Sequence, residues 1–265
     1  MNRARRLFSL LPLTAVAVTT LLAACSDSNS LAENDPGIAA NSGSTQTMVV
    51  PPGERVFGRS YGEWTAAWWQ WAYGIPVPSN PLFDETGSLC SSGQSGPVWF
   101  LAGVFNATGT AVRNACVVPA GKVLLVPVLN GECSNVEGNG TTEAEWRACA
   151  AAQMDLAVDV AANLDGAPVP DIASYRVQSP RAYRLTLPDN NILQLFGYDA
   201  PAGSCMPTGP GCTRYRSFAD GYYVMLAPPS PGPHTIHVHG AIPTFGFTLD
   251  VTYHLKVQSP GRDSH

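Results

Sequence analysis

The stretch Ser60–Pro76, SYGEWTAAWWQWAYGIP, constrains the fold most, because it concentrates four of the chain's six tryptophans in one segment. Ser60 and Glu63 have the spacing of a capping box, in which each side chain satisfies a free backbone N–H at a helix start. Gly74 and Pro76 supply a stop signal, so the stretch predicts one helix of about three and a half turns. A helix that is apolar nearly all round is normally buried, so the fold must enclose this one.

The predicted helix has two aromatic sides. Trp64, Trp68 and Trp71 share one arc, and Trp69 and Tyr73 lie on roughly the opposite side. We expect the arc to cover the apolar face of the alternating strand Phe245–Val257. The other two rings have two interpretations: they form a second buried face, or they line a groove and stack on a ligand. Trp69 and Tyr73 are therefore the candidate ligand-binding residues.

Residues 1–24 have the pattern of a secretory signal peptide, with three early arginines, an apolar run and small residues before Cys25. The letters LAAC that end at Cys25 resemble the lipobox of bacterial lipoproteins. This resemblance implies cleavage before Cys25 and acylation of that residue, which anchors a protein stably to a membrane. Ser26, in place of an aspartate, implies outer-membrane sorting if the source is Gram-negative. The alternative is a plain signal peptide with a chance cysteine.

The rest of the chain divides into a polar, flexible linker over 25–47, one globular domain over 48–258 and a short tail over 259–265. Hydrophobic residues make up 45% of the chain, which supports a sizeable core. Loss of the signal peptide leaves 12 of the 15 lysines and arginines against 20 acidic residues, a net charge of about −8. This acidic balance argues against a nucleic-acid or anionic-lipid partner. The expected partners are the membrane, through the lipid at Cys25, and an envelope protein or a glycan.

Six cysteines remain when Cys25 is set aside, and an even set in an exported chain predicts disulfides. Six cysteines allow about fifteen pairings. Pairing between sequence neighbours is favoured, which gives Cys90–Cys116, Cys133–Cys149 and Cys205–Cys212. Zinc is the competing interpretation, but no C-x2-C spacing occurs.

The remaining pattern predicts a mainly β (α+β) domain, an antiparallel β-sandwich or jelly roll with two helices and disulfide braces. Phe245–Val257 alternates apolar and polar residues, which is typical of a strand with one face in the core. After a second capping box, we expect a helix from Thr142 to about Leu164. Other expected strands lie at Pro97–Phe105, Ala111–Val118, Lys122–Leu129 and in several segments after Ser174.

His237 and His239, in the segment TIHVHG, are the candidate metal ligands. Two imidazoles at i and i+2 of a strand lie about 7 Å apart on one face and can share a divalent metal. A hairpin through the 240–244 loop is expected to pair residues whose numbers add up to about 485. That register places Asp250 diagonal to His237, where it could orient the imidazole, and places His254 about 20 Å or more away. The alternative is a pair of histidines in a polar groove, or one buried and hydrogen-bonded.

The segment TIHVHG resembles TIHWHG of multicopper oxidases, in which both histidines bind copper. A strand with H-x-H also resembles cupins and alpha-carbonic anhydrases. The other histidine pairs and the copper-binding cysteine motif of the oxidases are absent from this sequence, as is the glutamate of the cupins. The tryptophan stretch with SNPLFDETG, and the segment DGYYVMLAPPSPGPHTIH, resemble bacterial exported proteins of unknown function.

Other catalytic motifs are missing: the sequence has no G-x-S-x-G, no H-E-x-x-H, no P-loop and no dinucleotide fingerprint. Paired carboxylates for glycoside chemistry stay open, because they need not be close in sequence. We therefore favour a non-catalytic cell-envelope lipoprotein whose β-sandwich domain binds a ligand or a partner, with no resident cofactor. The alternatives are a metal-dependent enzyme or metal carrier that uses the H-x-H strand, and a purely structural envelope component.

Overall fold

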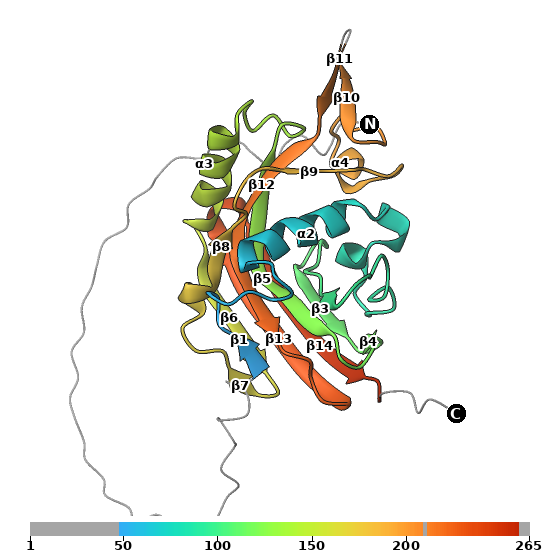
Figure 1. Cartoon of the computed structure of the whole chain (residues 1–265), viewed down its shortest axis with the longest axis vertical. Helices are drawn as coiled ribbons and strands as arrows, with labels where there is room; N and C mark the ends of the chain where they lie inside the picture. The colour runs from blue at the N-terminus through green and yellow to red at the C-terminus, as the bar shows by residue number, and fades with distance from the viewer. Residues whose placement is uncertain (1–47, 209–210, 260–265) are drawn as a thin grey trace, which may run out of the picture. The chain divides into compact units, whose positions relative to one another are not determined.

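The computed structural model describes residues 48–208 and 211–259; the predicted signal peptide, Cys25, the linker and the tail from 260 onward lie outside the described residues. Two β-sheets pack face to face, and helices lie against the outer side of one of them (Figure 1). The predicted fold class, a mainly β sandwich with helices, is confirmed. The sheets are mixed rather than purely antiparallel, because short edge strands pair in parallel.

The first sheet is built around two long antiparallel strands, β5 (Val123–Ser134) and β12 (Arg216–Leu226). Its other strands are β1 (Val49–Val50), β2 (Val98–Phe100), β8 (Arg176–Gln178) and β9 (Tyr183–Arg184). The apolar run that predicted burial of Lys122–Leu129 on both faces is confirmed, since nearly every residue of β5 is buried.

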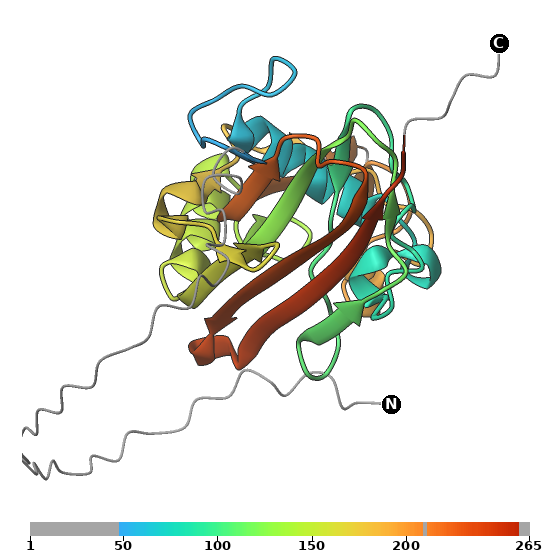
Figure 2. The ribbon, with the colours of Figure 1, turned by 90° about the horizontal axis from the view of Figure 1, so that it is seen from below.

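The second sheet is built around the hairpin of β13 (Gly232–Ile242) and β14 (Phe247–Val257), and Figure 2 shows β14 between β13 and β3. The other strands of this sheet are β3 (Thr110–Arg113), β4 (Val117–Val118), β6 (Val158–Leu164) and β7 (Ala167–Pro168). A separate hairpin consists of β10 (Cys205–Thr208) and β11 (Gly211–Arg214). The helices are α2 (Tyr61–Tyr73), α3 (Glu143–Met154) and α4 (Ile192–Leu195), with 3-10 turns η1 (Val77–Ser79), η2 (Pro81–Phe83), η3 (Ile172–Tyr175) and η4 (Pro243–Phe245).

Helix α2 begins and ends where the sequence predicts, with the capping box of Ser60 and Glu63 in place. It packs on the outer face of the first sheet, among Leu125 and Tyr223 of the central strands. The expectation that its tryptophan arc covers the alternating strand 245–257 is wrong. The apolar side of β14 packs instead against the inner face of the first sheet, and together they form the sandwich core. Gly62 allows the close approach of α2 to β8, because a Cβ there would lie 2.2 Å from the carbonyl oxygen of Gln178.

The second helix is shorter than predicted. Helix α3 ends at Met154, and the segment that was expected to continue it, Val158–Leu164, is strand β6. Asp159 has a φ of 55° at an irregularity of the pairing, and Ala161–Leu164 after it pair with Ile236–His239 of β13. Pairing with a long buried strand therefore outweighs the helical spacing of the apolar residues.

All three predicted disulfides are confirmed. The Cα–Cα distances are 5.3 Å for Cys90–Cys116, 6.0 Å for Cys133–Cys149 and 5.6 Å for Cys205–Cys212. The first bridge fastens the long loop after α2 to the segment between β3 and β4, and the second fastens α3 to β5.

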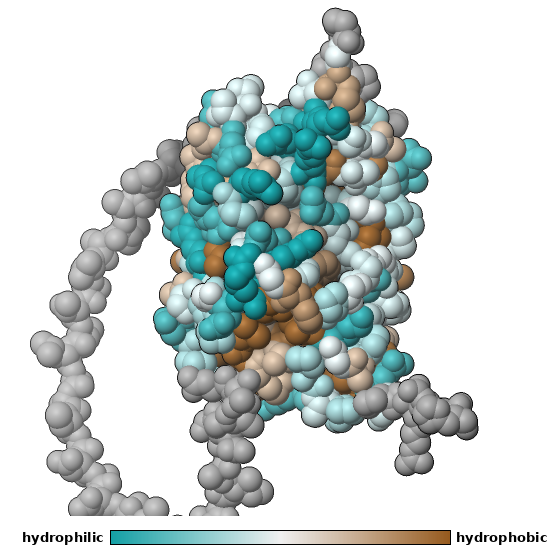
Figure 3. Space-filling model, viewed as in Figure 1, coloured by the Kyte–Doolittle hydropathy of each residue, from teal (hydrophilic) through white to brown (hydrophobic). Residues whose placement is uncertain are grey.

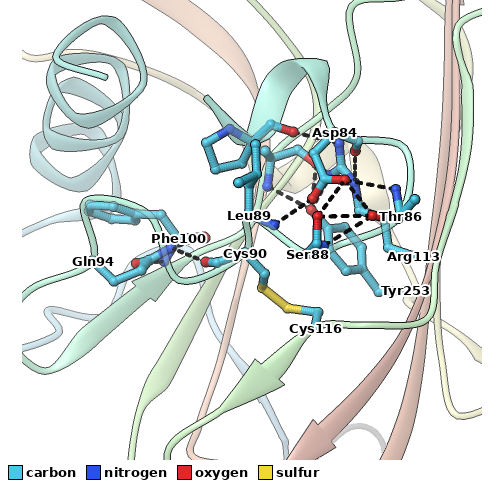
Figure 4. Close-up of a disulfide and its surroundings, with 12 residues drawn as sticks. Asp84, Thr86, Ser88, Leu89, Cys90, Gln94, Phe100, Arg113, Cys116 and Tyr253 are labelled. Carbon is cyan, nitrogen blue, oxygen red and sulfur yellow. Dashed lines mark hydrogen bonds between the residues drawn. A yellow bond between two sulfur atoms is a disulfide. The ribbon is translucent and has the colours of Figure 1, made fainter. Parts of the chain in front are cut away.

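A buried arginine fixes the same long loop from its other end (Figure 4). Arg113 is 1% exposed and has no carboxylate partner in the described part of the chain. Its guanidinium donates to the carbonyl oxygens of Pro81, Asp84, Ala102 and Gly103 at 2.6–2.8 Å, and also to the hydroxyl of Tyr253. Every N–H of the guanidinium therefore has an acceptor, which is the condition under which a buried charge is tolerated.

Replacing Arg113 with methionine should lower the free energy of unfolding by about 3–5 kcal/mol, because several buried carbonyl groups lose their donor together. Arg113→Lys keeps the charge but reaches fewer acceptors. Its free energy of unfolding should therefore lie between those of Arg113→Met and the wild type. Urea unfolding measures both, with Arg214→Met, at an exposed position, as the control. Wild-type stability in Arg113→Met would contradict this role.

Candidate functional site

The two candidate ligand-binding aromatics lie in the core. Trp69 is 4% exposed and Tyr73 is 5% exposed, so neither ring offers a face to solvent. The indole of Trp69 donates to the hydroxyl of Tyr223 at 3.1 Å, and the hydroxyl of Tyr73 donates to Glu132 at 2.7 Å. The expectation that they face a groove is therefore corrected, because the first sheet and its flanking loops cover this side of α2.

The two candidate metal ligands lie on the outer face of the second sheet, with Asp250 between them. Nε2 of His237 is 2.9 Å from one carboxylate oxygen of Asp250, and Nδ1 of His239 is 3.2 Å from the other. The predicted contact between Asp250 and His237 is present. Across residues 48–208 and 211–259, no group of three or more His, Cys, Asp or Glu side chains is arranged to hold a metal ion. Metal binding at His237 and His239 stays a prediction.

The predicted register of this hairpin is wrong by four. Paired residue numbers add up to 489, so His239 lies opposite Asp250, and His254 lies opposite Thr235. The pairing continues to Ile242, and the turn is made by η4 and by Gly246 in the left-handed conformation. His254 is therefore much closer to His237 than expected, although its Nδ1 lies 3.4 Å from the hydroxyl of Thr235 rather than facing the other imidazoles.

A serine, a histidine and an aspartate also meet, in an order that resembles a catalytic triad. Nδ1 of His234 is 2.8 Å from Asp165, and its Nε2 is 3.3 Å from the hydroxyl of Ser230. The same Nε2 lies 2.8 Å from the carbonyl oxygen of Ser230. A carbonyl accepts only, so Nε2 must carry a proton and cannot act as a base toward the hydroxyl. This cluster is therefore a structural clamp on the turn.

Two glutamates that are separated in sequence by a turn form a carboxyl pair, in which Glu132 is buried and Glu137 is half-buried. Glu132 accepts hydrogen bonds from Tyr73 and Ser217, and Glu137 accepts one from Ser134 at 2.8 Å. Burial, followed by the charge of Glu132 and a hydrogen bond to it, raises the pKa of Glu137 to about 10. At neutral pH the carboxyl group of Glu137 is therefore protonated.

The most ligand-like surface is a groove beside α2 that we call the arginine groove. It is lined by Arg59, Arg181, Arg184, Arg216, Glu63, Gln70 and Tyr183, with neighbouring residues of the 180–184 segment, and has a volume of about 860 Å³. None of these four arginines forms an ion pair, although the described residues of the chain contain more acidic side chains than basic ones. In Figure 3, strongly hydrophilic residues gather around α2 on the face that Figure 1 presents.

The polar groups of the arginine groove leave its four guanidiniums without an ion pair among the described residues. Glu63, the acidic residue of the groove, is engaged by the capping box and by Arg55 at 3.1 Å. Gln70 donates to the carbonyl oxygen of Arg184 at 2.9 Å, which joins α2 to β9. Nε of Arg216 is buried and makes no hydrogen bond within the described chain. Sequence analysis missed this site, because its arginines are spread from 59 to 216 and only the fold brings them together.

Comparison of the chain with protein-family models, with curated proteins and with solved structures finds no match. Within the described residues, no helix is both long and apolar enough to cross a membrane.

The carboxyl pair gives a prediction about pH. The pKa of Glu137 is raised to about 10 in the folded chain, against an ordinary value of 4.5, so the folded state holds a proton that the unfolded state loses. This contribution to stability is complete below about pH 4.5 and is lost as the pH rises toward about 10, at no more than about 1.4 kcal/mol per pH unit. Urea unfolding between pH 5 and pH 9 should therefore show a falling free energy of unfolding.

Glu137→Gln tests the cause of that fall. Its amide can donate to Glu132 but cannot titrate, so the slope over this pH range should flatten. Glu143→Gln, in an exposed ion pair on α3, is the control and should keep the wild-type slope. An unchanged slope in Glu137→Gln would show that the carboxyl pair is not the source.

Proposed function

We propose that this chain is a cell-envelope lipoprotein whose β-sandwich domain binds an anionic ligand in the arginine groove, without catalysing a reaction. The observation that carries the proposal is the group of four arginines in one groove, none of which forms an ion pair among the described residues. In a chain with an excess of acidic residues, unpaired arginines would be expected to find carboxylates on the protein itself. Here, the one carboxylate in the groove is already engaged.

The chemistry of the groove favours carboxylate, phosphate or sulfate groups. A guanidinium offers a rigid fork of N–H donors that matches these anions, and charge-assisted hydrogen bonds of this kind are strong. The buried Nε of Arg216 adds a donor that has no acceptor among the described residues. A buried donor without a partner costs about 1–3 kcal/mol, and an anion in the groove would recover that cost.

The proposed location comes from the lipobox at Cys25 and the polar linker that follows it. An acylated Cys25 would tether the domain to the membrane, with 25–47 as a spacer. The domain would then meet ligands within the envelope.

Calorimetric titration with inorganic pyrophosphate and with citrate tests the binding site. The wild type should bind these anions with an affinity that falls with salt, since the contacts are ionic. Arg181→Gln and Arg184→Gln should each weaken binding by about tenfold or more, the loss expected for one charge-assisted contact. Arg214→Gln, on the exposed strand β11, should bind like the wild type.

Absence of binding to both anions by the wild type would contradict the proposal. Equal affinity in Arg181→Gln, Arg184→Gln and Arg214→Gln would do so as well, because binding would then not depend on the groove.

A further inference from the structure

A second groove adjoins the arginine groove along α2. We call it the aromatic groove: it is lined by Phe57, Trp64, Trp71 and Phe100, together with Ser95 and the backbone of nearby glycines. Arg59 and Gln70 line both grooves, so the two form one surface with α2 between them. The indole N–H groups of Trp64 and Trp71 are bonded to backbone carbonyls, at 2.9 and 3.0 Å. Trp64 and Trp71 are 7% and 9% exposed, so only a small part of each ring, and no free donor, reaches the groove.

Phe57, on this surface, is unusual in both its exposure and its backbone conformation. It is 59% exposed, and its φ is 48°, a left-handed conformation that a bulky residue rarely adopts. Val56 and Arg59 pair around it, with Gly58 also at positive φ, as in a tight two-residue hairpin turn that favours asparagine at the Phe57 position. An exposed aromatic ring at a strained turn position has no packing reason, and such local conflicts concentrate at functional sites.

The same turn connects the two grooves. Arg59 follows Phe57 by two residues, and its guanidinium lies 4.9 Å from the centre of the Trp64 ring. The rings of Trp71 and Phe100 lie 5.5 Å apart and continue the aromatic wall. A ligand that reached both grooves would therefore meet an aromatic wall and cationic groups within one continuous surface.

We propose that the ligand is an acidic oligosaccharide, with a sugar ring against Phe57 and the aromatic wall and its acid group in the arginine groove. This inference rests on the proposed function. A sugar ring has a face of C–H groups that packs on an aromatic ring, and hydroxyls at its rim that need polar partners. The exposed side chains of Gln70 and Ser95 supply such partners. An acyl chain would instead favour an apolar groove without them.

The test compares three probes on the purified chain with Cys25→Ser, which carries no lipid. Hexagalacturonate carries sugar rings and carboxylates, its fully methyl-esterified form lacks the charge, and pyrophosphate lacks the ring. The wild type should bind hexagalacturonate more tightly than pyrophosphate and should bind the methyl ester at least tenfold more weakly than the acid. The tryptophan fluorescence should change on binding of hexagalacturonate, because Trp64 and Trp71 line the groove.

Phe57→Gly tests how much the aromatic ring of Phe57 contributes to the affinity for the sugar. Glycine accepts the positive φ, so the turn should remain while the ring is lost. Affinity for hexagalacturonate should fall about fivefold or more, with the affinity for pyrophosphate unchanged. Leu195→Ala, at a similarly exposed apolar side chain on α4, is the control and should leave both affinities unchanged.

Two results would overturn the acidic-oligosaccharide proposal. One is equal binding of hexagalacturonate by Phe57→Gly and the wild type. The other is recruitment of the chain to phosphatidylglycerol vesicles without binding of hexagalacturonate, which would identify a lipid headgroup as the ligand. The loss of pyrophosphate binding in Arg184→Gln decides the anion site separately, so failure of the sugar assignment can be told from failure of the proposed function.

Discussion

Burial of the first sheet on both faces is the constraint on which the rest of the structure depends. One face of β5 and β12 forms the sandwich core with β13 and β14, and the other face is covered by α2. The tryptophan side chains of α2 cover that second face, and they bring indole N–H groups into the interior. Trp68 and Trp69 are tolerated there because Leu101 and Tyr223 accept from them.

At two other places, buried polar groups are likewise tolerated because they are hydrogen-bonded. Arg113 joins the loop around Asp84, through the carbonyl oxygen of Asp84, to the hydroxyl of Tyr253 on β14, and Glu132 joins α2 to the first sheet through Tyr73 and Ser217. Neither group is required for hydrophobic burial. Both are hydrogen-bonded to several partners, so their burial gives a specific arrangement rather than a penalty.

Sequence reasoning found the features that local chemistry determines: the limits of α2, the three neighbouring disulfides and the alternation within β14. It could not find those that depend on a partner far away in the chain. A helical arrangement of tryptophans does not say which sheet face it will cover. A register of 485 and one of 489 have the same parity, so the alternation fits both, and only the turn before Phe247 chooses between them. The arginine groove also depends on residues far apart in the chain, so the sequence did not reveal it. Phe57 beside Gly58, in contrast, is a local signal for an unusual turn that the sequence does contain.

Two unfavourable features coincide on the one side of α2 that the fold leaves open. Phe57 holds a strained, exposed position, and four arginines avoid the carboxylates that an acidic chain offers in excess. The strained Phe57 and the unpaired arginines each lower stability only slightly, and packing explains neither of them. Their meeting at Arg59 and Gln70, which line both grooves, is the arrangement expected of a binding surface. An acidic chain repels anions at long range, so the affinity of such a site must come from short contacts in the grooves rather than from electrostatic steering, and geometry must select the ligand.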